Sequence, residues 1–288
     1  MSDPVWRFGY GSNMGLSNLK KKKNLTPLQY VPGVVEGWTL SFDLGGIDHV
    51  DPSFACVRRR QGEQVHGVAF LLNPDDAARL DREEGGYVLT PVRFDRYGGG
   101  VIEGVGLYAP KTPATNESRP PSLRYLRLLQ NGAAEAGLSP EYQQKLADIE
   151  FYVTAPAVRA QTLQWIAEFE QDPARKDVRW TAEQLATHNG KDPDLAPHTS
   201  CLGYVVRVRA PFPSWRGHTI TRRNILHFRG ESIDTGDIRV GKPGFLPLPD
   251  VTKCTAEELE FLYQNLDSLL HRGGFIVGRL SEFVAAQP

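Results

Sequence analysis

The sequence predicts an α+β fold in which a small closed β-sheet is followed by a mainly helical region. Three observations predict it. Short apolar segments, one with clear period-two alternation, occupy the first half, turns join most of them, and helical patterns dominate from Ser122 onwards. Short strands joined by turns favour an antiparallel or mixed closed sheet over a doubly wound parallel sheet.

The expected strands follow one another closely in the first 110 residues. Val5–Tyr10 is an apolar and aromatic run, and Val34–Asp43 alternates apolar and polar positions. Two hairpins are expected after them, each around a glycine-containing turn. They are Phe54–Arg60 with Gln64–Leu72 around Gln61-Gly62-Glu63, and Tyr87–Tyr97 with Val101–Tyr108 around Gly98-Gly99-Gly100.

One helix is expected between the two hairpins. Asn73 is a favourable N-cap, and Pro74 suits the first helical position because its missing N–H is not needed there. Asp75 and Asp76 suit the positive end of the helix, and Gly85-Gly86 ends it.

Helices dominate the second half, where Thr255–Leu270 has the clearest signal. Thr255 and Glu258 form a capping box, and leucines follow on one face. Residues 189–200 are expected to form a loop. The other expected elements are the helices Ser122–Gly137, Ser139–Ile149 and Ala155–Gln171, and the strand Leu202–Arg209.

Composition excludes several classes of protein. Lys and Arg number 33 against 34 Asp and Glu, which disfavours a generally basic nucleic-acid binder. No apolar run reaches the roughly 18–20 residues of a membrane span, and the first residues do not resemble a secretory signal. The 3 cysteines are widely spaced and form no CxxC pair, so neither a disulfide framework nor a zinc site is indicated. A reducing cytoplasm is the expected location.

The sharpest local motif is a glycine-rich turn after the first strand, Phe8-Gly9-Tyr10-Gly11-Ser12-Asn13. Glycines allow positive φ, and such a turn can direct several N–H groups at an anion. A dinucleotide loop fits poorly because the spacing is GxGxxxG. A nucleophile elbow at Ser12 fits poorly because glycines are missing at positions 10 and 14. An anion-holding loop of another enzyme and an ordinary tight turn both stay open.

A second motif lies at the end of the expected helix, where Leu80-Asp81-Arg82-Glu83-Glu84-Gly85 places two glutamates. The partial negative charge at a helix C-terminus disfavours an ionised carboxylate, which suits a group that exchanges protons near neutral pH. The alternative is a solvated helix end without a catalytic role.

Together the two motifs resemble the γ-glutamylcyclotransferase family, in which a strand ending in Tyr-Gly-Ser-Asn precedes Leu-Asp-x-x-Glu-Gly. The likeness covers roughly residues 5–150. The further blocks that carry it are Gln64–Asn73, Pro121–Tyr125 and Gly137–Glu150.

The resemblance implies a γ-glutamylcyclotransferase-like barrel in residues 1–154, without cofactor or metal. In the implied lyase-type acyl transfer, the α-amine of a γ-glutamyl group attacks its own γ-carbonyl and forms 5-oxoproline, as in glutathione metabolism and the γ-glutamyl cycle. The implied catalytic residue is Glu84, although a one-residue shift would exchange it with Glu83. The implied substrate-binding residues are Phe8, Gly9, Tyr10, Gly11, Ser12, Asn13 and Tyr142.

The departures from the family pattern reduce the number of substrate classes that the resemblance implies. Arg7 stands where relatives often have an aromatic residue, which leaves its role open. Asn13 argues against the glutathione-specific branch, and Ser12 argues against the γ-glutamylamine branch. The general branch for γ-glutamyl amino acids and the fungal biosynthetic branch both stay open. The expected partner is a small γ-glutamyl substrate, with a homodimer as the form any self-association would take, and neither membrane nor nucleic acid is expected.

Residues 155–288 form a C-terminal extension of unknown role. Within it, His198 to Arg229 has six arginines and no acidic residue. These arginines can pair with acids elsewhere, such as Asp234, Asp237 or Glu258, or supply a contact to a substrate carboxylate, or form an anion-binding face. The alternative to an enzyme is therefore a non-catalytic protein that keeps the barrel and binds an anionic partner through residues 198–229.

Overall fold

The computed structural model describes residues 3–111, 118–209, 215–230, 250–281 and 283. The chain divides into two compact units, one of Met1–Ile47 with Asp51–Tyr152 and one of Asp48–Val50 with Val153–Pro288. Within the described residues, no helix has both the length and the apolar character that a membrane crossing requires.

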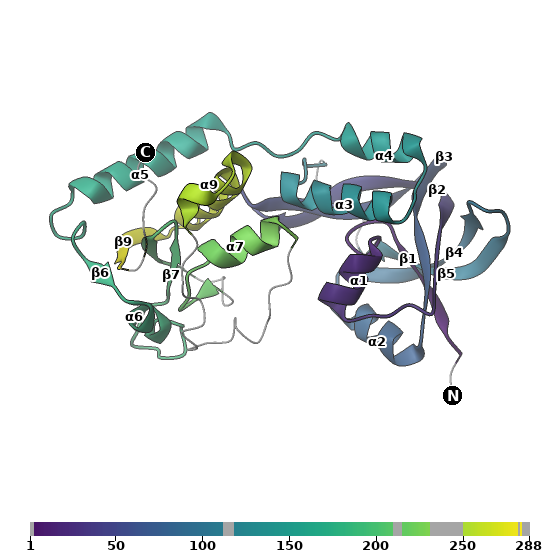
Figure 1. Cartoon of the computed structure of the whole chain (residues 1–288), viewed down its shortest axis with the longest axis horizontal. Coiled ribbons are helices and arrows are strands. Elements are labelled where there is room, and N and C mark those ends of the chain that lie inside the picture. The colour runs from purple at the N-terminus through teal and green to yellow at the C-terminus, as the bar shows by residue number, and fades with distance from the viewer. Residues whose placement is uncertain (1–2, 112–117, 210–214, 231–249, 282, 284–288) are drawn as a thin grey trace. The chain divides into compact units, whose positions relative to one another are not determined.

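A closed five-stranded barrel forms the first unit, in the spatial order β1-β3-β2-β4-β5 (Figure 1). Strand β1 pairs antiparallel with β3 and parallel with β5, which closes a mixed sheet and confirms the predicted fold class. Phe8, Phe94 and Leu107 are fully buried in its core. The strands are β1 Val5–Gly9, β2 Gln29–Ile47, β3 Asp51–Leu72, β4 Tyr87–Arg96 and β5 Val101–Pro110.

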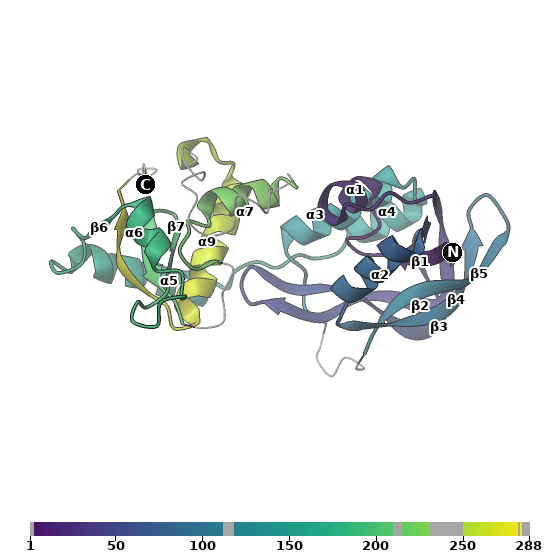
Figure 2. The same ribbon diagram turned by 90° about the horizontal axis from the view of Figure 1, so that it is seen from below.

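The expected hairpin around Gln61-Gly62-Glu63 is wrong, because β3 continues through these residues. Strand β2 pairs with both halves of β3, and the register shifts between Glu36 and Trp38. Gly37 and Gly62 have φ of 76° and 80° at this irregularity. Gly62 therefore lies at an irregularity in the pairing of two long strands and not at a chain reversal. The long β2–β3 pair extends beyond the other strands (Figure 2).

Four helices accompany the barrel: α1 Leu16–Lys23, α2 Pro74–Glu83, α3 Leu123–Glu135 and α4 Pro140–Ala147. Helix α2 confirms its prediction, with the Asn73 side chain accepting a hydrogen bond from the Asp76 N–H at 2.8 Å. Helices α3 and α4 begin after the N-caps Ser122 and Ser139. Helix α1 was not predicted, because its lysine-rich sequence has little amphipathic pattern and no side-chain cap.

The second unit combines helices with a four-stranded sheet of order β6-β9-β8-β7. Its helical content is as expected for the extension, whereas most of the sheet was missed. Helix α9 packs against both α5 and α7. The elements are α5 Pro156–Gln171, β6 Arg179–Trp180, α6 Ala182–Thr187, β7 His198–Cys201, β8 Tyr204–Arg207, α7 Thr221–Phe228, the short 3-10 helix Val251–Lys253, α9 Ala256–His271 and β9 Phe275–Leu280.

The predictions for residues 189–209 need correction. Residues 198–201 form strand β7 rather than loop, and the expected strand Leu202–Arg209 is shorter because its first two residues form a turn. Leu202 and Gly203 have φ of 50° and 79°, which suits a two-residue hairpin between paired Cys201 and Tyr204. The sequence did not predict this turn, because Gly203 is typical of a turn and Leu202 is not.

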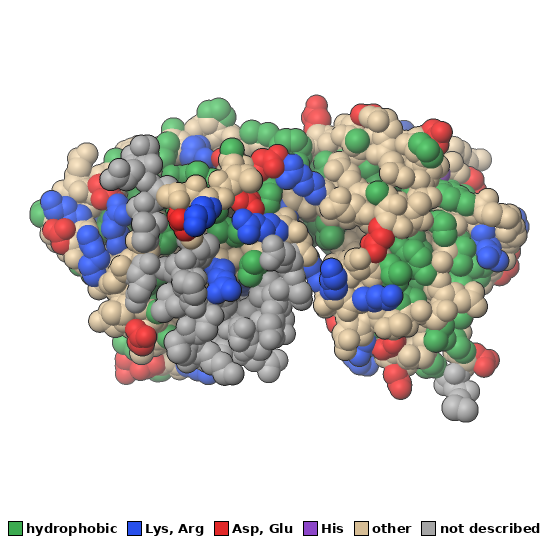
Figure 3. Space-filling view, in the orientation of Figure 1, with side chains coloured by type: hydrophobic (Ala, Val, Ile, Leu, Met, Phe, Trp, Pro, Cys, Tyr) green, Lys and Arg blue, Asp and Glu red, His purple; other side chains and the backbone are tan. Residues whose placement is uncertain are grey.

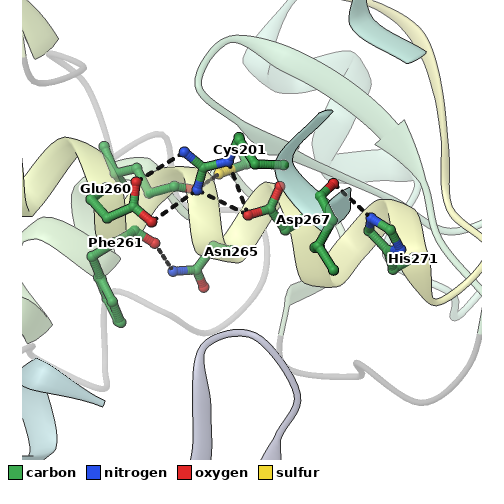
Figure 4. A network of polar contacts seen from close by, with 9 residues as sticks. Cys201, Glu260, Phe261, Asn265, Asp267 and His271 are labelled. Carbon is green, nitrogen blue, oxygen red and sulfur yellow. Dashed lines mark hydrogen bonds and ion pairs between the residues drawn. The ribbon is translucent and has the colours of Figure 1, made fainter. Parts of the chain in front are cut away.

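Helix α9 contains the predicted capping box of Thr255 and Glu258. Farther along, Arg159 of α5 contacts two of its acids, Glu260 at 2.9 Å and Asp267 at 3.0 Å (Figure 4). The Asp267 side chain is 0% exposed, so this ion pair holds a carboxylate away from water. On the visible face of each unit, positive and negative side chains are interspersed, in line with the near-zero net charge (Figure 3).

Candidate active site

The glycine-rich turn leaves β1 and closes on itself within five residues. The Met14 N–H donates to the Gly11 carbonyl at 3.0 Å. A Cβ on Gly9 would lie 2.5 Å from the Asn13 carbonyl oxygen, and one on Gly11 would lie 3.3 Å from the Tyr125 hydroxyl. Neither glycine has positive φ. These glycines are needed for close approach, and not for the left-handed backbone that the sequence suggested.

The same turn leaves several backbone donors available. Among the described residues, no acceptor faces the N–H groups of Gly11, Ser12 and Asn13. Backbone N–H groups that have no protein partner ordinarily bind water or a ligand. Three successive donors in one turn can hold a carboxylate or an oxyanion.

Glu84 is the residue that ends helix α2. Its N–H donates to the Leu80 carbonyl at 3.0 Å, and its φ of −86° and ψ of 36° depart from helical values. This departure is what separates the two adjacent glutamates. Glu84 lines a pocket with the glycine-rich turn, whereas the Glu83 side chain is 44% exposed and pairs with Lys23 at 2.8 Å.

The Glu84 carboxylate has two partners from distant parts of the sequence. Its Oε1 accepts a hydrogen bond from Asn13 Nδ2 at 2.9 Å and lies 3.4 Å from Lys23 Nζ. The side chain is 16% exposed, so it is partly shielded yet open to a ligand. An amide donor and an ammonium group both suit the ionised form, which is the form a general base requires.

Four tyrosines complete the pocket: Tyr10, Tyr87, Tyr108 and Tyr125. Burial raises the pKa of each phenol, to about 12 for Tyr125, and the Glu84 charge adds to the rise. Their hydroxyls therefore stay protonated at neutral pH, and the pocket wall is neutral apart from Glu84.

Two of these tyrosines are fixed on the backbone of one residue. The Tyr87 hydroxyl donates to the Ala55 carbonyl at 3.2 Å, and the Tyr125 hydroxyl accepts from the Ala55 N–H at 3.3 Å. Of the four pocket tyrosines, Tyr10 was predicted for the site, and Tyr87, Tyr108 and Tyr125 were not. The signal for Tyr125 was its place in the Pro121–Tyr125 block, and that for Tyr87 was its position just after the helix-ending glycines.

Arg7 gains a defined role beside the pocket. Its Nε and Nη2 bind the two Asp81 oxygens at 2.9 and 2.7 Å, and the Tyr108 hydroxyl donates to Asp81 at 2.5 Å. These contacts join helix α2 to strands β1 and β5, three residues before Glu84. They lower the pKa of Asp81 even though burial opposes the shift. A bidentate pair fixes direction as well as distance, so Arg7 holds the end of α2 against the barrel.

The structure brings together seven of the eight predicted site residues. Glu84 and the six residues Phe8–Asn13 line one pocket. Tyr142 does not line it. Its ring stacks on His66 with centroids 4.3 Å apart, in the barrel core, and Tyr125 instead faces the pocket. Sequence spacing alone could not distinguish which tyrosine of the two late helices faces the turn.

The arginines of residues 198–229 have mixed surroundings. Arg229 pairs with Glu258 at 2.5 Å, as one of the alternatives anticipated. Asp234 and Asp237, the other acids proposed as partners, lie outside the described residues. Cys201 is fully buried, and burial raises its pKa, which does not favour a nucleophile.

Comparison with known proteins identifies relatives of about half the chain. A γ-glutamylcyclotransferase of Bos taurus is 30% identical over 158 residues, covering 50% of this chain and 77% of the relative. The γ-glutamyl cyclotransferase gliK of Aspergillus fumigatus is 29% identical over 189 residues, covering 56% of this chain and 68% of the relative. A solved γ-glutamyl cyclotransferase structure aligns with a TM-score of 0.47 and 25% identity over 53% of this chain and 92% of its own. No family model matches the chain.

Proposed function

Because the chain belongs to the γ-glutamylcyclotransferase family, we propose that its barrel converts a γ-glutamyl amino acid or conjugate to 5-oxoproline and a free amine. The observation that supports this most is the meeting of Glu84, Asn13 and the free N–H groups of the turn at one small pocket. The nucleophile of such a reaction is the substrate's own α-amine. The protein then needs to orient it, move protons and stabilise charge.

The proposed reaction forms one bond and breaks another. The α-nitrogen attacks the γ-carbonyl carbon, and the electron pair of the carbonyl moves to its oxygen. When this tetrahedral intermediate collapses, the bond to the leaving nitrogen breaks. The α-ammonium loses two protons in becoming the lactam N–H, and the leaving nitrogen gains two in becoming an ammonium group. A single carboxylate that carries protons between the two nitrogens suffices.

We assign that carboxylate to Glu84. The Asn13 amide and Lys23 hold it in place before the α-ammonium binds. The N–H groups of Gly11, Ser12 and Asn13 are assigned to the oxyanion or to a substrate carboxylate. The Tyr125 hydroxyl accepts a hydrogen bond from the Ala55 N–H, so its own proton can be donated to a substrate without a competing negative charge.

The test is release of 5-oxoproline by the purified full chain. One arm supplies γ-glutamyl dipeptides and a second supplies glutathione thioether conjugates, which separates the two substrate branches left open by Ser12 and Asn13. Glu84→Gln keeps the shape of the side chain and removes its basicity. We expect turnover to fall by about 10²–10⁴-fold, the usual worth of a general base.

Glu83→Gln is the matched control, since it changes the same residue type one position away on an exposed, Lys23-paired side chain. Its turnover should stay within a few fold of the wild type. Full activity in Glu84→Gln, or equal losses in both variants, would contradict the assignment. Absence of turnover on every substrate would favour the alternative of a non-catalytic binding protein.

A further inference from the structure

A ligand-sized cavity separate from the barrel pocket lies within the second unit. It is a groove of about 520 Å³ where β8 ends and β9 begins, facing the loop of residues 190–197. Its volume lies in the range of about 300–1,000 Å³ typical of small-molecule sites. The barrel activity proposed above does not use it, so the two can be tested separately.

Three of the six arginines in residues 198–229 line this groove: Arg207, Arg209 and Arg216. In the part of the chain that the structure describes, none of their guanidinium groups lies within ion-pairing distance of a carboxylate. They differ in this from Arg229, which is paired with Glu258. Three such arginines against the two aspartates of the lining, Asp192 and Asp194, give the cavity a positive formal charge that favours an anion.

Two glycines with positive φ lie beside Arg216 and Arg209. A Cβ on Gly190, where φ is 78°, would lie 2.8 Å from Arg216 Nη1. A Cβ on Gly273, where φ is 83°, would lie 3.4 Å from Arg209 Cδ. The backbone thus approaches the Arg216 side chain closely at Gly190, whereas the distance at Gly273 is that of ordinary van der Waals contact. A restricted Arg216 side chain lowers the entropy that a ligand must remove on binding.

The other side of the groove offers different chemistry. Asp192 and Asp194 lie in the facing loop, where one Asp192 oxygen already accepts the Asp194 N–H at 2.9 Å. Phe275 is 45% exposed and is paired in register with Arg207, whose guanidinium lies 5.7 Å from its ring centre. An exposed aromatic ring beside a guanidinium is a surface on which a flat ring can stack.

We propose that this groove binds a nucleoside diphosphate or a closely similar organic phosphate. The arginines match phosphate oxygens, which accept two parallel hydrogen bonds from one guanidinium. The exposed Phe275 ring matches a base, and the aspartates match sugar hydroxyls, which are donors. A tricarboxylate would satisfy only the arginines, and inorganic phosphate would leave most of the cavity unfilled.

Titration calorimetry of the full chain with ADP tests the proposal, with pyrophosphate, adenosine and citrate as the other probes. We expect saturable binding of ADP that is tighter than binding of each other probe. The double variant Arg209→Gln/Arg216→Gln should weaken ADP binding at least tenfold. Phe275→Ala should weaken ADP binding and leave pyrophosphate binding unchanged.

Arg222→Gln is the matched control, because it removes one charge from the same basic segment outside the groove. It should bind ADP within twofold of the wild type. Absence of saturable ADP binding at millimolar concentration, citrate binding as tight as ADP binding, or an equal loss in the control would each overturn the proposal. Urea unfolding of each variant tests whether it is folded, so that a loss of ADP binding can be told from a loss of stability.

Discussion

Arginines have different surroundings at the two pockets, one in each unit. In the barrel unit, Arg7 forms an ion pair with Asp81, and the buried Arg124 forms one with Asp51 at 2.8 Å. In the second unit, Arg207, Arg209 and Arg216 line a cavity without a described carboxylate partner. A paired arginine fixes the position of an element, whereas an unpaired arginine in a groove is available to a ligand. The surroundings of a charge, and not its presence in the sequence, decide which of these roles it has.

The second unit also contains arginines that are paired with carboxylates. Arg159 is paired with Asp267, whose side chain is 0% exposed. Replacing Arg159 by Met would leave a carboxylate buried without its cation. We expect the free energy of unfolding of this unit to fall by about 3 kcal/mol, the largest stability effect predicted for this protein.

Urea denaturation followed by circular dichroism measures that loss. Lys253→Met is the control, because Lys253 is 82% exposed and pairs with a neighbouring aspartate on the surface. Its effect should be much smaller. If both variants unfold at the same urea concentration, the buried pair does not contribute as the structure indicates.

In the barrel unit, the corresponding variant is Asp81→Asn. It removes the carboxylate of the Arg7–Asp81 ion pair that holds α2 against the barrel. The Arg7 side chain is 13% exposed, so its charge would lose a shielded partner. We expect a loss of about 2 kcal/mol in the free energy of unfolding. We also expect kcat to fall about tenfold with a smaller change in KM, because displacement of Glu84 affects proton transfer more than binding.

Steady-state kinetics on the folded variant separates these two effects. Arg7→Lys keeps the positive charge but loses the bidentate contact with Asp81. This variant should therefore lose less stability than Asp81→Asn but still have a reduced kcat. Arg93→Gln removes a surface arginine that is 62% exposed and should change neither quantity appreciably. A normal kcat in Asp81→Asn would show that the Arg7–Asp81 ion pair does not position Glu84.

The effect that is smallest at neutral pH is shared by both units, and it grows as the pH falls. Burial lowers the pKa of His66 in the barrel and of His198 in the second unit to about 4. Below about pH 6.5 the unfolded chain binds a proton at each position and the folded chain does not. Stability therefore decreases as the pH falls from 7 towards 4, with a slope of at most one proton per histidine.

Histidine NMR signals followed between pH 7.5 and 4.5 measure this directly. The His66 and His198 rings should remain neutral over most of the range. Titration of either ring near 6.5 would show that its surroundings are wetter than the structure indicates. A stability change in one unit only would mean that the two histidines are not equivalent.

Local sequence signals predicted the parts of the fold that neighbouring residues decide. Asn73 and Pro74 begin α2, and the capping box of Thr255 and Glu258 begins α9, as the sequence indicates. Signals of the same kind failed where distant pairing overrides them. Gly62 has the glycine and positive φ of a turn, yet β2 pairs along both halves of β3 and keeps the strand continuous.

By itself the sequence determined the strand-rich first half, the capped helix that ends in two glutamates, and the glycine-rich turn. These features depend on backbone preferences and caps that act over a few residues. Only the tertiary structure decided that Glu84 and not Glu83 meets Asn13, that Tyr125 and not Tyr142 faces the turn, and that three arginines share one groove. Asn13 and Glu84 are 71 positions apart, and contacts over such separations depend on how the strands close and the helices pack.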